Sequence, residues 1–276
     1  MNRFLMIVAH YTKRMLRDPK EIVLLLAIPI GLIIINSLIA GGDLEAETGI
    51  SLAGYNILTS FMAPAFLLSF QFFNSFFMFI FLYKDFRSGM RWRLCATPCP
   101  VRAFVFPAFI ANWLVSIALG VVYIVVTAVF MNVYWGNLFI LAAVLVMISL
   151  MATVVACLIF LFTHKLSQAN AIGYIVSFGL MVLSGFMVPL QLFGDNAVIR
   201  FLLNHGTPLS LGQTAIISSG ALDTIFDGTD IFIGLPGFGM GAEGGMERAF
   251  INIGILAAIT LVLGLIAVMV ARRRKI

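Results

Sequence analysis

The chain has 276 residues, of which 62% are apolar and 11% are charged, whereas soluble domains carry about 25% charged residues. A water-soluble core of this size could not bury so much apolar surface, so an ordinary soluble domain is excluded and lipid must cover part of the chain. The net charge is +5, and most of the basic residues lie in the segments between the apolar stretches or at the chain ends. It therefore indicates membrane topology and attraction to anionic lipid headgroups, and it does not indicate a nucleic-acid partner.

Residues 2–18 have the pattern of an amphipathic helix. One stripe is apolar and comprises Phe4, Val8, Tyr11 and Met15. Another stripe is basic and comprises Arg3, His10, Arg14 and Arg17. This geometry predicts a helix that lies in the membrane interface, with its basic face towards lipid phosphates. Pro19 cannot continue the helical hydrogen-bond ladder and ends this element before the first apolar stretch.

Six stretches contain no Asp, Glu, Lys, Arg or His and reach the roughly 17–25 residues that a membrane-spanning helix needs. They are 22–40, 58–82, 103–131, 138–162, 169–193 and 249–271. The segments 1–21, 83–102, 163–168 and 272–276 hold 15 of the 17 Lys and Arg residues. The segments 41–57, 132–137 and 194–248 hold 9 of the 12 Asp and Glu residues. The positive-inside rule then predicts an all-α polytopic membrane protein with six transmembrane helices and both termini in the cytoplasm.

Several spans carry polar side chains, which are costly in hydrocarbon unless they face protein or water. The candidates for a substrate pathway are Asn36, Gln71, Asn74, Asn112 and Ser116. Gln71 and Asn74 share one helical face, and we expect both to be shielded from lipid. Stripes of small and weakly polar residues in the third, fourth and fifth spans favour close helix packing, with a substrate-lining role as the alternative.

Two connecting segments differ from simple turns. The segment 83–102 is basic, and residues 88–96 could form a short helix that Thr97-Pro98 ends. The segment 194–248 has helical character over 197–219 and continues as a glycine-rich loop. It is too short and too rich in glycine to form a core of its own, so a single domain is expected.

The sequence lacks the motifs of nucleotide, metal or catalytic sites. It contains neither G-x-x-x-x-G-K-[ST] nor H-E-x-x-H, and its three histidines are scattered. We expect Cys95, Cys99 and Cys157 to be unpaired thiols, and we expect no catalytic residue and no metal site. Proton-driven carriers usually need titratable groups within the membrane, and the six spans have no Asp, Glu, Lys, Arg or His. If the protein pumps, its energy is expected to come from another molecule.

Two sequence segments resemble those of a known family. Six spans with inner termini and a basic interfacial helix resemble the permease subunits of type-2 ABC transporters. The stretch from Asp85 to Pro98 resembles the inner loop of that family, through which the ATPase acts. This resemblance implies an ATPase-coupling loop comprising Asp85, Arg87, Gly89, Arg91, Arg93, Leu94, Thr97 and Pro98. The chain departs from the family pattern at Met90, Arg91 and Arg93, where the family often has Thr and then an acidic residue. The stretch from Ser184 to Pro189, followed by Pro208, is similar to the family segment that leads into short re-entrant helices.

The resemblance implies one transmembrane permease domain over 1–276. It divides into an interfacial helix (1–21), five spans (22–193), an extracytoplasmic loop with re-entrant helices before the last span (194–248), and a sixth span with a basic tail (249–276). The implied function is ATP-driven export of a lipophilic or amphiphilic drug, antibiotic or peptide-like compound across a bacterial plasma membrane. The implied partners are an ABC ATPase subunit, which binds ATP and Mg, a second permease copy or paralogue, and membrane lipids. The chain itself is expected to bind no cofactor. The alternative is a channel or secondary carrier that works without ATP, and a membrane enzyme or a structural membrane protein would be a third class.

Overall fold

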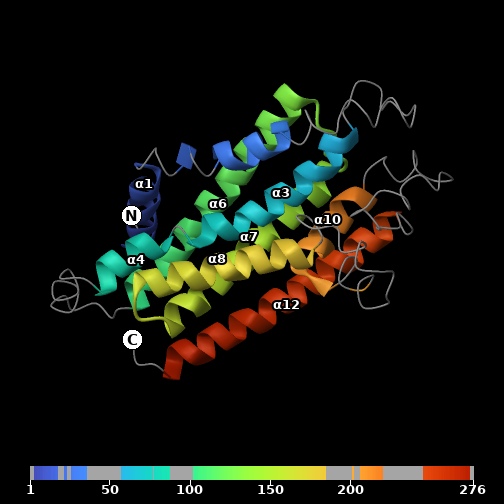
Figure 1. Ribbon diagram of the computed structural model, residues 1–276. Helices are drawn as coiled ribbons and strands as arrows, with labels where there is room; N and C mark the ends of the chain where they lie inside the picture. Colours follow the sequence, from blue (N-terminus) through green and yellow to red (C-terminus); the bar gives the residue numbers. More distant parts are fainter. Residues whose placement is uncertain are drawn as a thin grey trace.

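The computed structural model describes residues 3–17, 22–23, 26–35, 57–76, 78–87, 102–184, 201, 206–219 and 245–273. Within these residues every regular element is a helix, and the long helices run side by side as a bundle (Figure 1). The elements are α1 (Arg3–Leu16), α3 (Ile57–Phe76), α4 (Met78–Arg87), α6 (Arg102–Met131), α7 (Leu138–Phe162), α8 (Leu166–Leu183), α10 (Pro208–Ser218) and α12 (Gly245–Arg273). The all-α prediction is confirmed for this part of the chain.

Among the described residues, five helices are long and apolar enough to cross a membrane. They cover Met62–Asp85, Val105–Met131, Leu138–Phe162, Leu166–Leu183 and Met246–Arg272. The first of these joins α3 and α4, and all five overlap predicted spans. In the remaining predicted stretch, 22–40, the structure describes a shorter apolar helix, Leu26–Ile35. The count of six therefore stays a prediction, whereas a multi-pass membrane protein is established.

The fifth predicted span differs from the observed helix at both ends. The helix begins at Leu166 and ends at Leu183, whereas the apolar stretch predicted residues 169–193. Ser184 closes the last turn, because its N–H and its hydroxyl both donate to the carbonyl of Leu180. The rest of the predicted span, 185–193, lies outside the described residues.

The amino-terminal helix and the carboxyl-terminal end of α12 lie at the same end of the bundle (Figure 1). The end of α4 and the turn 163–165 lie at this end too, and α10 lies at the opposite end (Figure 1). This matches the grouping of basic segments that the charge pattern predicts. For brevity, the end that carries α1 is called the basic end.

Two clusters of buried apolar side chains form the core. One cluster joins α3, α6, α7, α10 and α12, with Leu68, Phe72, Ile148 and Leu209 at its centre. The other joins α1, α4, α6 and α7 at the basic end. The second cluster matters for function because it fixes α1 to the bundle.

The small and weakly polar stripes face the inside of the bundle, as expected for packing. On α6 the buried members are Asn112, Ser116, Gly120, Tyr123 and Thr127. Ser149 and Thr153 on α7, and Gly173 and Ser177 on α8, are also buried. The hydroxyls of Thr127 and Thr153 donate to backbone carbonyls four residues earlier, which satisfies them within their own helices.

Helix α10 is enclosed on its sides by other helices. It packs against α3, α7, α8 and α12, and nearly all of its side chains are buried. Thr207 caps its first turn by accepting from the N–H of Ser210, while the Ser210 hydroxyl accepts from the N–H of Thr207. The hydroxyls of Ser184 and Thr207, 2.6 Å apart, connect this cap to the end of α8. The predicted helical character of 197–219 is thus confirmed over Pro208–Ser218, and a re-entrant path stays a prediction.

Candidate functional site

Helix α1 is fixed to the basic end of the bundle by one of its faces. Val8, Tyr11 and Met15 recur at helical spacing and are buried against α6 and α4. At the start of α1, the ring of Phe4 lies 5.9 Å from the ring of Phe106 on α6. The apolar stripe of the predicted amphipathic helix therefore packs largely against protein.

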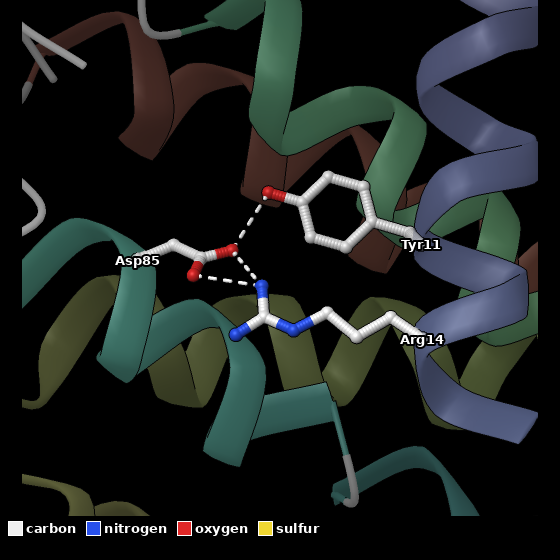
Figure 2. A network of polar contacts seen from close by, with 3 residues as sticks. All are labelled: Tyr11, Arg14 and Asp85. Atoms are coloured by element: carbon white, nitrogen blue, oxygen red, sulfur yellow. Dashed lines mark hydrogen bonds and ion pairs between the residues drawn. The ribbon is translucent and has the colours of Figure 1, made fainter. Parts of the chain in front are cut away.

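Near its other end, α1 makes an ion pair with the end of the second span. Arg14 Nη1 lies 2.8 Å from both carboxylate oxygens of Asp85, and the Tyr11 hydroxyl donates to Asp85 Oδ2 at 3.0 Å. Figure 2 shows both α1 side chains pointing towards the Asp85 carboxylate on α4. The pair joins residues 71 positions apart in the sequence and thereby holds two separate elements together.

This pair is less exposed to water than a surface salt bridge, so removal of one partner would leave a buried charge uncompensated. Asp85 is only 5% exposed, so its charge depends on its partners rather than on water. The Arg14 guanidinium also lies 5.1 Å from the centre of the Phe81 ring, within cation–π range. Burial, reinforced by the nearby Asp85 carboxylate, raises the pKa of Tyr11 far above its ordinary value, so its phenol stays protonated and donates.

The sequence pattern placed Arg14 on a basic face towards lipid, and this assignment is wrong. Arg14 is about a quarter exposed and turns to Asp85 instead. Tyr11 was assigned only to the apolar stripe, although its hydroxyl belongs to the same network. A signal was present in the sequence: Tyr11 and Arg14 share a helix face, and Asp85 is an isolated acidic residue at the end of a span. The sequence does not show which cation Asp85 pairs with, because that depends on how α1 packs against α4.

The arrangement can act as a rigid mechanical connection. Asp85 is the last residue of the span Met62–Asp85, and the predicted coupling loop starts there. Two residues earlier, the Tyr83 hydroxyl donates to the carbonyl of Thr163, the residue that follows α7. A displacement of the segment after Asp85 would therefore be passed to both α1 and α7.

The structure describes only part of the predicted coupling loop. Asp85 lies in α4, and Arg87 is the last residue of that helix. Gly89, Arg91, Arg93, Leu94, Thr97 and Pro98 lie outside the described residues. Their role in coupling stays a prediction.

Four of the five predicted pathway residues lie inside the bundle. Gln71, Asn74, Asn112 and Ser116 are all buried, which confirms that Gln71 and Asn74 are shielded from lipid, and Asn36 lies outside the described residues. Ser149 on α7 donates to Gln71 Oε1 at 3.0 Å, and Asn112 on α6 donates to Thr153 Oγ1 at 3.4 Å. These bonds connect α3, α6 and α7. No described residue donates to Asn74 Oδ1.

An aromatic surface lies where α3 meets α8. The ring of Phe73 is 5.4 Å from that of Phe178 and 6.2 Å from that of Tyr174, and Phe70 packs 5.4 Å from Phe73. Tyr174 and Phe178 are about half exposed. Flat aromatic rings that are partly open can receive an apolar molecule.

No group of three His, Cys, Asp or Glu side chains that could hold a metal occurs in the described part of the chain. Cys157 is a free thiol inside α7. The described geometry thus offers a mechanical connection and an aromatic surface.

Comparison with known proteins agrees with this architecture. Residues 51–269 match the family described as ABC-2 family transporter protein. A search of curated proteins gave no significant match. The matched region contains all five helices long enough to cross a membrane, apart from the final residues of α12, and it includes Asp85 and the aromatic surface. The chain therefore belongs to the ABC-2 family of transporter proteins.

Proposed function

We propose that the chain is the permease subunit of an ATP-driven exporter in a bacterial plasma membrane, with both termini in the cytoplasm. Family membership over residues 51–269 carries this proposal, because ABC-2 permeases are transport components that normally work with an ATPase subunit. The absence of a P-loop motif from the sequence supports a separate motor. The motor binds ATP and Mg, and a second permease copy or paralogue completes the assembly.

The coupling mechanism follows from the connection at the basic end. Closure of the ATPase would push on the segment after Asp85, where the loop from Asp85 to Pro98 begins. The ion pair with Arg14 would carry this movement into α1, and the bond from Tyr83 to Thr163 would carry it into α7. Rigid elements displaced in this way would reorient the spans between inward-open and outward-open states.

The cargo is lipophilic or amphiphilic, such as a drug, an antibiotic or a peptide-like compound. Support comes from the partly exposed aromatic surface of Phe73, Tyr174 and Phe178. The buried amides of Gln71, Asn74 and Asn112 lie in the neighbouring helices α3 and α6 and would supply polar contacts when the bundle opens.

The test uses the chain reconstituted in vesicles with and without its ATPase. Uptake of a lipophilic fluorescent dye into vesicles should require the ATPase, ATP and Mg, and should stop when the P-loop lysine of the ATPase is replaced. Dye accumulation by the chain alone, against a gradient, would instead identify a secondary carrier. Dissipation of a gradient by the chain alone would identify a channel.

A further inference from the structure

Helix α1 has an outward surface that its contacts with the bundle leave open. Leu5, Ala9 and Leu16 form an exposed apolar strip at helical spacing. His10, Lys13 and Arg17 form an exposed basic strip beside it, at positions i, i+3 and i+7. Arg14 does not belong to this surface, because Asp85 neutralises it. Among the described side chains of this strip, Lys13 and Arg17 are therefore the Lys and Arg residues that the surface offers.

The depth of α1 in the membrane is fixed by its two contacts. Phe4 touches Phe106, which is the second residue of the span Val105–Met131. Arg14 touches Asp85, which is the last residue of the span Met62–Asp85. Both ends of α1 thus lie level with the ends of spans. The helix consequently lies along the membrane surface, where the hydrocarbon meets the headgroups.

We propose that the outward surface of α1 binds anionic phospholipid headgroups, and that the Arg14–Asp85 ion pair transmits the resulting restraint of α1 to α4. Acyl chains would contact Leu5, Leu16 and the 62%-exposed ring of Phe106. Phosphates would contact Lys13 and Arg17. A mixed apolar and basic surface at this depth suits a charged lipid better than an acidic protein surface, which would leave the apolar strip in water.

Lipid binding to α1 would affect α4 because Asp85 lies in α4 and is bonded to Tyr11 and Arg14 of α1. A headgroup that holds Lys13 and Arg17 restrains α1, and α1 holds the last turn of α4 through the ion pair and the Tyr11 hydrogen bond. The predicted coupling loop begins at this turn. Anionic lipid would therefore stiffen the start of that loop, and this regulatory consequence rests on the proposed function.

The first experiment measures the lipid preference of the purified full chain without any ATPase. Phosphatidylglycerol and phosphatidylcholine are titrated separately into the solubilised chain, and bound lipid is counted by native mass spectrometry. Replacing both Lys13→Gln and Arg17→Gln should reduce the preference for phosphatidylglycerol about 25-fold, since each surface cation contributes about five-fold. The matched control, Lys165→Gln with Arg272→Gln, removes two exposed cations at the same end and should keep the preference.

The second experiment follows hydrogen exchange of α4 in nanodiscs. Exchange over Met78–Arg87 should slow when phosphatidylglycerol replaces phosphatidylcholine. The Asp85→Asn variant frees Arg14 and should bind the lipid at least as well, but should lose most of this response because the ion pair to α4 is gone. If the variant with both Lys13→Gln and Arg17→Gln keeps the preference for phosphatidylglycerol, the proposed lipid site on α1 is wrong. If hydrogen exchange of α4 in the wild type is the same in both lipids, the proposed connection between α1 and α4 is wrong. Lys13 and Arg17 can also be labelled with amine and guanidinium reagents. If they are protected only when the ATPase is present, the surface binds a protein partner and not lipid. None of these outcomes depends on transport, so each is distinct from failure of the proposed function.

Discussion

Arg14 and Asp85 differ in how easily each side chain reaches water, and this asymmetry predicts unequal effects of replacing them. The Arg14 side chain is 28% exposed, whereas that of Asp85 is 8% exposed. Arg14→Gln would leave a buried carboxylate with only the Tyr11 hydroxyl, and should lower the free energy of unfolding by about 2 kcal/mol, between the values for buried and surface pairs. Asp85→Asn should cost less, because Arg14 can turn to solvent and the new amide can still accept from Tyr11.

Thermal unfolding of the purified chain in detergent checks this order. Lys13→Gln is the matched control, since it removes an exposed cation from the same helix and should change the unfolding free energy by less than about 0.5 kcal/mol. If Arg14→Gln and Lys13→Gln lower the free energy of unfolding equally, the ion pair stabilises the chain no more than any surface cation does.

Gly120 is the residue that lets α3, α6 and α7 approach each other. A Cβ at this position would lie 2.6 Å from Gln71 Nε2 and 2.6 Å from Leu145 Cδ1. Gly120→Ala should therefore displace Gln71 from Ser149 and destabilise the bundle by about 1–3 kcal/mol. Gly264→Ala is the control, because a Cβ there meets no atom within 4 Å. The unfolding midpoints of the two variants should differ clearly; matching midpoints would show that the three helices can move apart without cost.

The hydroxyl of Thr207 connects the start of α10 to a neighbouring helix. Thr207 accepts from the N–H of Ser210 and contacts the hydroxyl of Ser184, so it joins the first turn of α10 to the end of α8. Thr207→Ala should cost about 1 kcal/mol through loss of the cap. It should also speed hydrogen exchange in Pro208–Ser218. Thr207→Ser keeps the hydroxyl and should restore slow exchange, whereas fast exchange in both variants would assign the effect to the lost methyl group.

Hydropathy and charge predicted the spanning helices well because a span is apolar all round, whether it faces lipid, as Met246–Arg272 mostly does, or is largely enclosed by other helices, as Met62–Asp85 is. The span 138–162 is reproduced at both ends, and the grouping of basic segments matches the end that carries α1. The enclosed α10 and the pairing of Asp85 with Arg14 were less accessible. Both depend on which elements pack together. A periodic pattern shows which face of a helix is apolar, but it does not show which element packs against that face. For the same reason the helical span of α1 and its apolar stripe were predicted correctly, whereas Arg14 was assigned to the lipid-facing basic stripe instead of to Asp85.

The path of the chain through the bundle predicts a sixth crossing. Helix α1 is held at the basic end by Asp85, whereas the span Met62–Asp85 begins at the other end. The chain between residues 17 and 57 must therefore travel the length of that span, about 35 Å for 24 residues in helical form. The charge-free stretch 22–40 is long enough to do so, and the described helix Leu26–Ile35 lies within it.

Cysteine accessibility in intact bacterial cells tests this crossing. In a background with Cys95, Cys99 and Cys157 replaced by serine, a single cysteine at Glu45 should react with a membrane-impermeant maleimide added outside. A cysteine at Lys20 should react only after the cells are opened, and so should one at Lys275, because both basic ends would be cytoplasmic. Labelling of residues 20 and 45 from the same side would mean that 22–40 does not cross. The five remaining spans would then place residue 20 and residue 275 on opposite sides, since an odd number of crossings would separate them.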